Sequence, residues 1–343
     1  MADRGDNNFI RYVYRGEEDE IIPREATHIT VAKSVTIVRA NAFRGHPNIV
    51  EIICHDGVEK IEREAFYHCP VLQRVIMPGV KIVWDEAFCS CDRLQNVECD
   101  KLEVIKDGAF WNCPRLRSVD LLSARTVEWS AFNHTALRDV KFGSKLERIN
   151  DSAFGNCFAL QRITIPLKDG LLVGDVHDGD DIFIECHYLR HVDVVEGELQ
   201  ETVAALHLED WRNDMNEEID SINRILPNAA AGYEWDYDAD EYGDPGEKAQ
   251  AIRSWIRSVL GKIIHYQAEQ ESLLNEAATT LQFVLPQYLV TNNVVSFLAL
   301  PSHSFEVEED GVEDDHDDMY ANGSYSEGED SGMEVDNSDD EEE

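Results

Sequence analysis

An Ala-Phe pair recurs through the first half of the chain at an almost fixed spacing. Its phenylalanines are Phe43, Phe66, Phe88, Phe110, Phe132 and Phe154, so successive pairs lie 22 or 23 residues apart. A fixed period of about 20 to 50 residues is typical of solenoids, because a unit of this size cannot bury its apolar face alone and must stack on its neighbours. The sequence therefore predicts a stack of coils that share one core.

Apolar residues recur at linked offsets within each unit. Three of them follow each Ala-Phe pair, as in Ile49, Ile52 and Cys54, with the spacing L-x-x-L-x-L. The last two are separated by one residue, which is the alternation of a short strand with one buried face. A second apolar pair lies seven and four residues before each alanine, as in Val35 and Val38, and predicts the opposite wall of the coil.

The motif AF-x-x-C-x-x-L resembles the BspA-like leucine-rich repeat family over roughly residues 27 to 195. It is found at Ala65 to Leu72, Ala87 to Leu94, Ala109 to Leu116 and Ala153 to Leu160. The resemblance implies a right-handed solenoid of about seven units with short parallel strands on its concave face, and binding rather than catalysis. The sequence departs from the motif where His46 and Thr135 replace the cysteine and where the fifth unit is one residue shorter.

Helical periodicity replaces the repeat from Ala204 onward. Leu208, Trp211, Met215, Ile219, Ile222 and Leu226 lie three or four residues apart until Pro227. Asp244, Pro245 and Glu247 then form an N-cap, a first-turn proline and a capping-box acid, which predict the start of a long helix. The apolar seam of this helix is Ile252, Ile256, Val259, Ile263, Tyr266, Gln270, Leu273, Ala277 and Val284.

This seam has a heptad spacing and needs a partner. We expect an antiparallel hairpin with the preceding helix, or a homodimer through the long helix where the hairpin leaves the seam exposed. The alternative is that the first helix only caps the open end of the solenoid. The fold class expected is therefore α+β: a leucine-rich-repeat solenoid followed by a long-helix hairpin or coiled coil and a disordered tail.

The expected division of the chain has six parts. These are an N-terminal cap (1–26), the solenoid (27–196), a first helix (197–227), an acidic connector (228–244), a long helix with a trailing segment (245–300) and an acidic tail (301–343). The tail has almost no apolar residues and cannot offset its ordering entropy. Its serines beside acids, Ser324, Ser326, Ser331 and Ser338, fit phosphorylation or an inert solubilising tail equally well.

Charge and leader sequence limit the partners and the compartment. Acidic residues outnumber basic ones by 69 to 30, with 37 acidic and 6 basic residues beyond Gly197. This balance disfavours nucleic acid, which needs Lys and Arg to displace counterions. The N-terminus has no apolar leader, and no run approaches the roughly 18 apolar residues of a membrane span. We expect no membrane insertion and a cytoplasmic protein, with the nucleus as the alternative.

The cysteines and one acidic segment are the candidates for metal binding in this sequence. A zinc site could use Cys69, Cys91 and Cys113, but their spacing follows the repeat, so buried reduced thiols are expected. The segment DVHDGDD, Asp175 to Asp181, lies in an insertion expected to be a surface loop, and it lacks the spaced acids of a calcium-binding EF-hand. No phosphate-binding glycine loop, nucleophile elbow or catalytic constellation is found, so no metal, cofactor or catalytic residue is predicted.

Residues beside the buried middle of each strand should point away from the core. They form the predicted partner-binding surface: Glu51, Ile53, Arg74, Ile76, Asn96, Glu98, Ser118, Asp120, Asp139, Lys141, Arg162 and Thr164. Ile53 and Ile76, rimmed by Glu51 and Arg74, are the expected hot spot. The predicted function is a non-catalytic scaffold for protein partners of unknown identity. The alternative is a hydrolase or metal-dependent enzyme whose site lies in the helical region.

Overall fold

The computed structural model describes residues 9–173, 182–195, 197–229 and 247–283, all within one compact unit, Met1–Val307. The expected N-cap at Asp244, the acidic segment from Asp175 to Asp181, seam residue Val284 and the tail lie outside the described residues.

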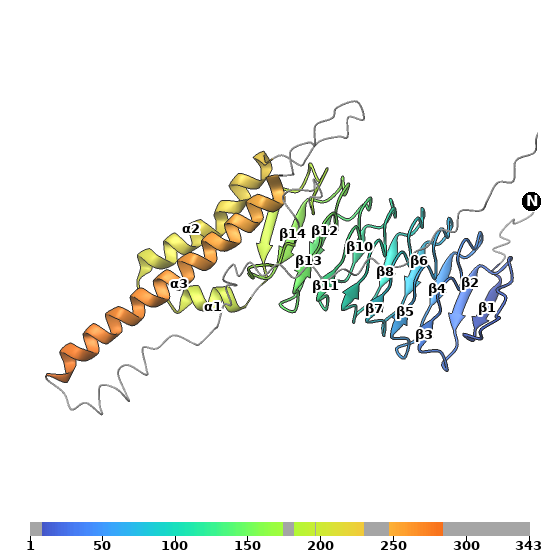
Figure 1. Cartoon of the computed structure of the whole chain (residues 1–343), viewed down its shortest axis with the longest axis horizontal. Helices are drawn as coiled ribbons and strands as arrows, with labels where there is room; N and C mark the ends of the chain where they lie inside the picture. Colours follow the sequence, from blue (N-terminus) through green and yellow to red (C-terminus); the bar gives the residue numbers. More distant parts are fainter. Residues whose placement is uncertain (1–8, 174–181, 196, 230–246, 284–343) are drawn as a thin grey trace, which may run out of the picture. The chain divides into compact units, whose positions relative to one another are not determined.

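Parallel strands, one above the other, build a solenoid (Figure 1). The first sheet contains β1 (Arg11–Tyr14), β2 (His28–Val31), β4 (Glu51–Ile53), β6 (Arg74–Ile76), β8 (Asn96–Glu98) and β10 (Ser118–Val119). It continues after a gap as β12 (Asp139–Lys141), β14 (Arg162–Ile165) and β15 (His191–Val194). The opposite wall contains β3 (Ile37–Val38), β5 (Lys60–Ile61), β7 (Ile82–Val83), β9 (Val104–Ile105), β11 (Thr126–Val127) and β13 (Arg148–Ile149).

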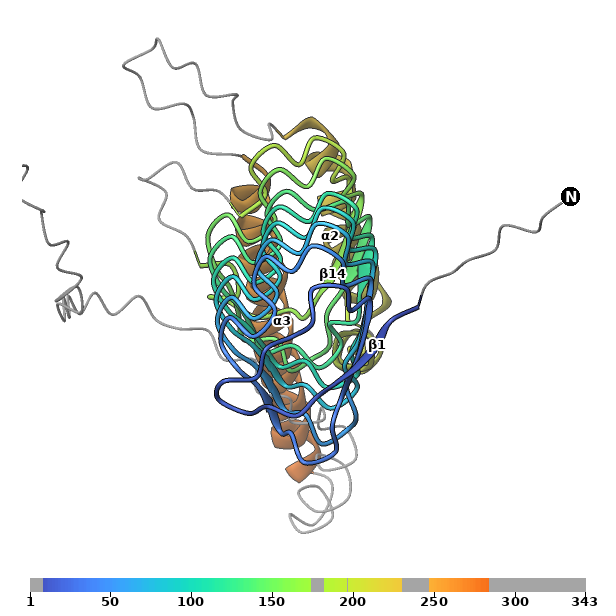
Figure 2. The same cartoon turned by 90° about the vertical axis from the view of Figure 1, so that its right-hand side faces the viewer.

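The two apolar sets expected from the repeat line the two walls of one core. The strand set is buried at every position except Val119 and, in the last coil, Val194, which are half-buried, and the opposite set is buried throughout. Between the walls the repeat phenylalanines form a stack, with neighbouring ring centroids 4.9 Å apart at the N-terminal end and 6.0 Å apart at Phe154 and Phe183. The expectation of coils that share one core is therefore confirmed, and the coils superpose when viewed along the stack (Figure 2).

The repeat cysteine donates a hydrogen bond between coils. The Sγ of Cys69 lies 3.1 Å from the carbonyl oxygen of Phe43, and Cys113 and Cys186 contact the carbonyls of Phe88 and Phe154 at 3.1 and 3.0 Å. All eight cysteines are free thiols and all are buried. Burial raises the pKa of two further cysteines, Cys54 and Cys99, which directly follow β4 and β8, to about 12, so both thiols remain protonated at neutral pH.

Two local differences from the expected solenoid concern its C-terminal half. The insertion expected to be a surface loop is packed over its described part, because Leu171 and Leu172 are buried and Leu172 bridges to Ile149 of β13. The gap between β10 and β12 coincides with the shortened fifth unit, where the parallel pairing is reduced to the bridge Leu121↔Phe142. The single deletion thus weakens the ladder without changing its register.

The single helix expected over 197–227 is two helices. They are α1 (Glu198–Ala204) and α2 (Glu209–Ile225), which is followed by the short 3-10 turn η1 (Leu226–Asn228). The chain is extended at Leu208, with φ −92° and ψ 133°. Leu206 is buried beside this break, and its carbonyl oxygen accepts a hydrogen bond from Arg212. The apolar period did not reveal the break, because its clear part begins at Leu208.

The long helix α3 (Glu247–Gln282) runs antiparallel to α2. Trp255 Nε1 donates to the carbonyl of Glu218 near one end, and Gln270 Oε1 accepts from the backbone N–H of His207 at the other. The expected hairpin is therefore what the structure contains. No helix among the described residues is long and apolar enough to cross a bilayer.

The hairpin also closes the solenoid: α2 packs against α3 and caps the last coil as well, so the alternative in which the first helix only caps and the second is free is wrong. The side chain of Asn223 on α2 accepts from the N–H of Val192 at 2.9 Å and donates to its carbonyl at 3.3 Å. Lys248 on α3 is buried, and its Nζ donates to the carbonyls of Leu189 and Leu226 at 3.0 and 2.9 Å. Lys248 therefore joins the last coil, η1 and α3.

Most of the predicted seam is used within the chain. Ile252, Ile256, Val259 and Ile263 are buried, and so is the polar side chain of Gln270. Beyond Gln270 the helix extends past α2, and Leu273 and Ala277 are exposed. The buried part cannot serve a second copy as well, so a homodimer through α3 remains a prediction only for this last stretch.

Candidate functional site

The twelve predicted binding residues lie on one face of the first sheet and of its continuation β12, β14 and β15, and we call this face the strand surface. The strand register aligns Glu51 with Arg74, and Ile53 with Ile76. Further along the stack it aligns Lys141 with Thr164. Glu51, Ile76 and Thr164 are half-buried and the other nine residues are exposed. The structure therefore gathers them into two columns, while their role in binding remains a prediction.

Ion pairs hold several charged side chains of the strand surface in place. Arg74 lies between two acids, with its Nη1 3.3 Å from Glu51 Oε1 and its Nη2 2.7 Å from Glu98 Oε1. Arg162 similarly pairs with Asp193 on β15, at 2.9 Å. Exposed pairs of this kind contribute little to stability. Their effect here is that neither Arg74 nor Arg162 presents an unpaired positive charge on the strand surface.

An apolar strip lies at the N-terminal end of the strand surface. The side chain of Ile53 is 37% exposed, and Ile76 is half-buried beside it. The register continues the strip to Thr30 on β2 and Val13 on β1, of which Val13 is 47% exposed. Both lie before the first Ala-Phe pair, so the repeat spacing did not identify them. The alternation in Arg11–Tyr14, RYVY, was the available signal.

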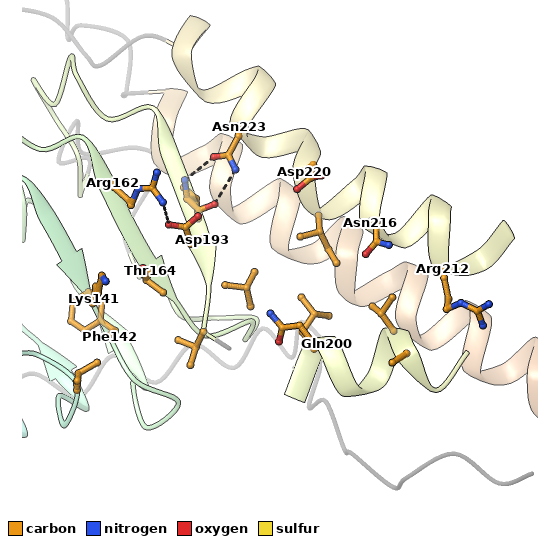
Figure 3. A pocket seen from close by; sticks show the side chains of 18 residues that line it. Lys141, Phe142, Arg162, Thr164, Asp193, Gln200, Arg212, Asn216, Asp220 and Asn223 are labelled. Carbon is orange, nitrogen blue, oxygen red and sulfur yellow. Dashed lines mark hydrogen bonds and ion pairs between the residues drawn. The ribbon is translucent and has the colours of Figure 1, made fainter. Parts of the chain in front are cut away.

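A pocket of about 900 Å³ lies at the other end of the strand surface, where β12, β14 and β15 meet α1 and α2 (Figure 3). Three predicted residues line it: Lys141, Arg162 and Thr164. Apolar side chains, including Phe142, Leu199 and Ile219, make up part of its wall. A pocket with an apolar wall and a few polar side chains is typical of binding sites.

The helices contribute lining residues that sequence reasoning missed. Arg212, Asn216, Asp220 and Asn223 on α2 all line the pocket (Figure 3). They are four, four and three residues apart, which places them on one face of the helix. That polar stripe was visible in the sequence. The surface that this stripe faces could not be predicted, because α2 and β15 make contact between residues that are far apart along the chain, such as Asn223 and Val192.

The two metal sites suggested by the sequence can be compared with the described residues. Among residues 9–173, 182–195, 197–229 and 247–283, no group of three or more His, Cys, Asp or Glu side chains is placed to hold a metal ion. The thiols considered for zinc, Cys69, Cys91 and Cys113, each donate to a phenylalanine carbonyl instead. The segment considered for calcium lies outside the described residues.

Comparison with known proteins identifies the repeat. The sequence model of the BspA type leucine rich repeat region matches residues 24–128 and 103–199, with six copies. A leucine rich cell surface protein from Faecalibacterium prausnitzii is 20% identical with a TM-score of 0.31, and the match covers 52% of this chain and 62% of that one. The pneumococcal vaccine antigen PcpA is 18% identical with a TM-score of 0.36, and the match covers 54% of this chain and 56% of that one.

A leucine rich repeat protein of T. pallidum is 21% identical with a TM-score of 0.33, and the match covers 54% of this chain and 69% of that one. The chain thus spans less than two thirds of the first two structures. No curated protein matches it at a significant level.

Proposed function

The chain belongs to the BspA-type leucine-rich repeat family, and from this premise we propose that it is a non-catalytic protein-interaction module that binds through the strand surface. Leucine-rich repeats typically present an extended binding surface on stacked strands. One observation carries the proposal: the register aligns the predicted residues into two columns, interrupted at the gap between β10 and β12, that begin at an apolar strip and end at a pocket.

The apolar strip supplies the anchor of the proposed interface. Binding energy usually concentrates in a few apolar or aromatic contacts surrounded by polar groups that exclude water. Ile53 and Ile76 have this setting, because the ion-paired Arg74 and Glu51 lie beside them in the adjacent column. The pocket supplies a second contact region at the far end. A partner that spans both would lie along the stack.

The test compares two matched double variants of the full chain. Ile53→Ser with Ile76→Ser alters the apolar strip, whereas Ile37→Ser with Ile82→Ser alters one exposed and one half-buried isoleucine on the opposite sheet. The partner is first identified by pull-down with the unaltered chain from native lysate, and its affinity is then measured by calorimetry. We expect the first variant to bind at least tenfold more weakly, a loss of about 1.4 kcal/mol, and the second to bind normally.

Circular dichroism confirms that both variants fold. Unchanged affinity of the Ile53/Ile76 variant would contradict the assignment of the strip. A loss in the Ile37/Ile82 variant alone would move the interface to the opposite sheet. Filling the pocket with Thr164→Arg tests the second contact region independently, because Thr164 lies far along the column from Ile53.

We further propose that the protein works in a reducing compartment, the cytoplasm, with the nucleus as the alternative. Free, buried cysteines support this proposal, because disulfides characterise small domains of oxidising compartments. Antibody staining of the source cells tests it. Detection of the protein only outside the cell would contradict it.

A further inference from the structure

The two ends of the strand surface differ in whether the backbone N–H and C=O groups of the terminal strand have hydrogen-bond partners. At the N-terminal end, β1 pairs with β2 on one side only. The N–H of His28 donates to the carbonyl of Ile10, and that of Ala32 donates to the carbonyl of Tyr14. In a parallel ladder this register directs the backbone groups of Tyr12 and Tyr14 toward β2. The amide and carbonyl groups of Arg11 and Val13 therefore face away from it.

No hydrogen bond from any described residue reaches these outward groups of Arg11 and Val13. Figure 2 looks onto this end of the solenoid, with β1 in front of the other strands. At the opposite end, the corresponding edge of β15 is covered at Val192, because the Asn223 side chain both accepts from and donates to its backbone. An uncovered strand edge is a template for another strand, and proteins usually block it.

Apolar exposure and charge balance also distinguish the N-terminal end. Phe9, Val13 and Ile21 are 58%, 47% and 87% exposed, although the terminal unit of a solenoid normally has a polar outer face. Residues 9–39 contain five basic and five acidic residues, in a chain whose net charge is −39. Most of that net charge lies beyond Gly197, where 37 residues are acidic and 6 are basic, so the C-terminal parts of two copies would repel each other. This end is a place where that repulsion is locally absent.

We propose that β1 pairs with β1 of a second copy of this chain, antiparallel and across a twofold axis at Tyr12. In this register Arg11 faces Val13 of the second copy, and Val13 faces Arg11. Each of these two pairs exchanges two backbone hydrogen bonds, so the four free groups on each edge are all satisfied. No arginine lies opposite another arginine. The edge is therefore complementary to itself, as an isologous interface requires.

This pairing goes beyond the proposed partner binding and does not depend on it. It would join the first sheets of two solenoids into one sheet. It would also place the apolar strip of each copy beside that of the other, because Val13 belongs to both features. A dimer would thus present two strand surfaces that meet at the twofold axis.

The first experiment measures the mass of the full chain by sedimentation at tens of micromolar, a range that detects weak self-association. The unaltered chain is expected to form a dimer. Val13→Pro removes the outward N–H without removing a bond to β2, and proline is tolerated on edge strands. It is expected to give a folded monomer. Val13→Thr keeps the N–H and the β-branched shape, and it should remain a dimer.

A monomeric unaltered chain would overturn the proposal. So would a Val13→Pro variant that dimerises as well as the Val13→Thr control. Circular dichroism of both variants shows whether the solenoid is intact. Because the strand-surface test above uses Ile53 and Ile76, failure of either idea leaves the other measurable.

A second experiment tests the register of the proposed β1 pairing, in variants that keep the backbone N–H groups of residues 11 and 13. The native thiols are buried, so a cysteine introduced at position 11 or 13 is the exposed one among the described residues. Directly opposed residues in a hydrogen-bonded pair have Cα atoms about 5.5 Å apart, within the range that a disulfide can bridge. A mixture of Arg11→Cys and Val13→Cys chains should form a cross-linked dimer under mild oxidation.

Each of these variants alone places its cysteines on a diagonal, about 7 to 8 Å apart, and should cross-link far less. Equal cross-linking in the mixture and in the single variants would overturn the register. Absence of cross-linking in all three samples would overturn the pairing of β1 with a second copy.

Discussion

The repeat cysteine contributes to the fold in two ways. It fills the core as a small apolar group, and its thiol donates to a carbonyl of the preceding coil. The sequence predicted the first role from the spacing alone. The second explains the two departures from the motif. Thr135 places a hydroxyl 3.2 Å from Cys157 Sγ, and His46 Nε2 lies 3.1 Å from the carbonyl of Pro23. Both replacements retain a hydrogen-bonding group, as a plain apolar residue would not.

His46 should make stability depend on pH. Burial lowers the pKa of His46 below its usual value of about 6.5. As the pH falls, the unfolded chain therefore binds a proton at a higher pH than the folded chain does. The stability present above about pH 6.5 is lost as the pH falls through the folded pKa. The N–H of Asn48 also donates to His46 Nδ1, at 3.4 Å, and protonation would end this contact.

We expect His46→Gln, which keeps a donor for the Pro23 carbonyl, to lose less stability than the unaltered chain between pH 7 and pH 5. Urea unfolding at each pH measures the difference. His207→Gln, at an exposed histidine, is the control for the substitution itself. Parallel pH profiles of the unaltered and His46→Gln chains would contradict the prediction.

At the scale of the elements, the turns limit what each coil can contain. Residues two positions after the repeat phenylalanine have positive φ, such as Gly45 at 66° and Asn112 at 54°. A Cβ added to Gly79 would lie 2.0 Å from the backbone oxygen of Asp56 in the preceding coil. The periodic apolar positions predicted the strands well, because short strands depend on local alternation. These close approaches between coils leave no signal in the spacing.

We expect Gly79→Ala to destabilise the fold by about 3 kcal/mol or more, because two backbones must separate to admit the methyl group. Gly45→Asn is the matched change, since nothing lies within 4 Å of its added Cβ and Asn112 already occupies the equivalent position with positive φ. It should cost less than about 1 kcal/mol. Chemical denaturation measures both, and equal losses would show that Asp56 moves freely.

Substitution of Lys248 measures how much the contact between the hairpin and the last coil contributes to stability. Lys248→Met keeps the stem but leaves the carbonyls of Leu189 and Leu226 without this donor, at a cost of about 1 to 3 kcal/mol for each buried group. Lys262→Met is the control, because Lys262 is partly exposed and pairs with Asp214 and Glu218 near the surface, where each ion pair contributes about 1 kcal/mol or less. Limited proteolysis and thermal unfolding compare the two. A smaller effect at Lys248 than at Lys262 would contradict this reading.

At the scale of the whole molecule, local patterns were predictable and distant contacts were not. The two columns of the strand surface follow from alternation within strands and a constant period, so the sequence predicted each residue by position. The pocket depends on how α1 and α2 lie against β15, which no periodicity encodes. Likewise, α3 and its seam were recognisable, but the role of Asn223 in covering the edge of β15 required the positions of both elements.

The gap between β10 and β12 shows which changes in length this architecture accepts. Loss of one residue in the fifth unit leaves the apolar positions in register and costs only part of one strand pairing. Loss or duplication of a full period would preserve every contact type, since each coil offers the same groups above and below. The number of coils is therefore free to vary over generations by copying whole segments. Copying a coil would lengthen the strand surface and leave β1 and the hairpin at its two ends unchanged.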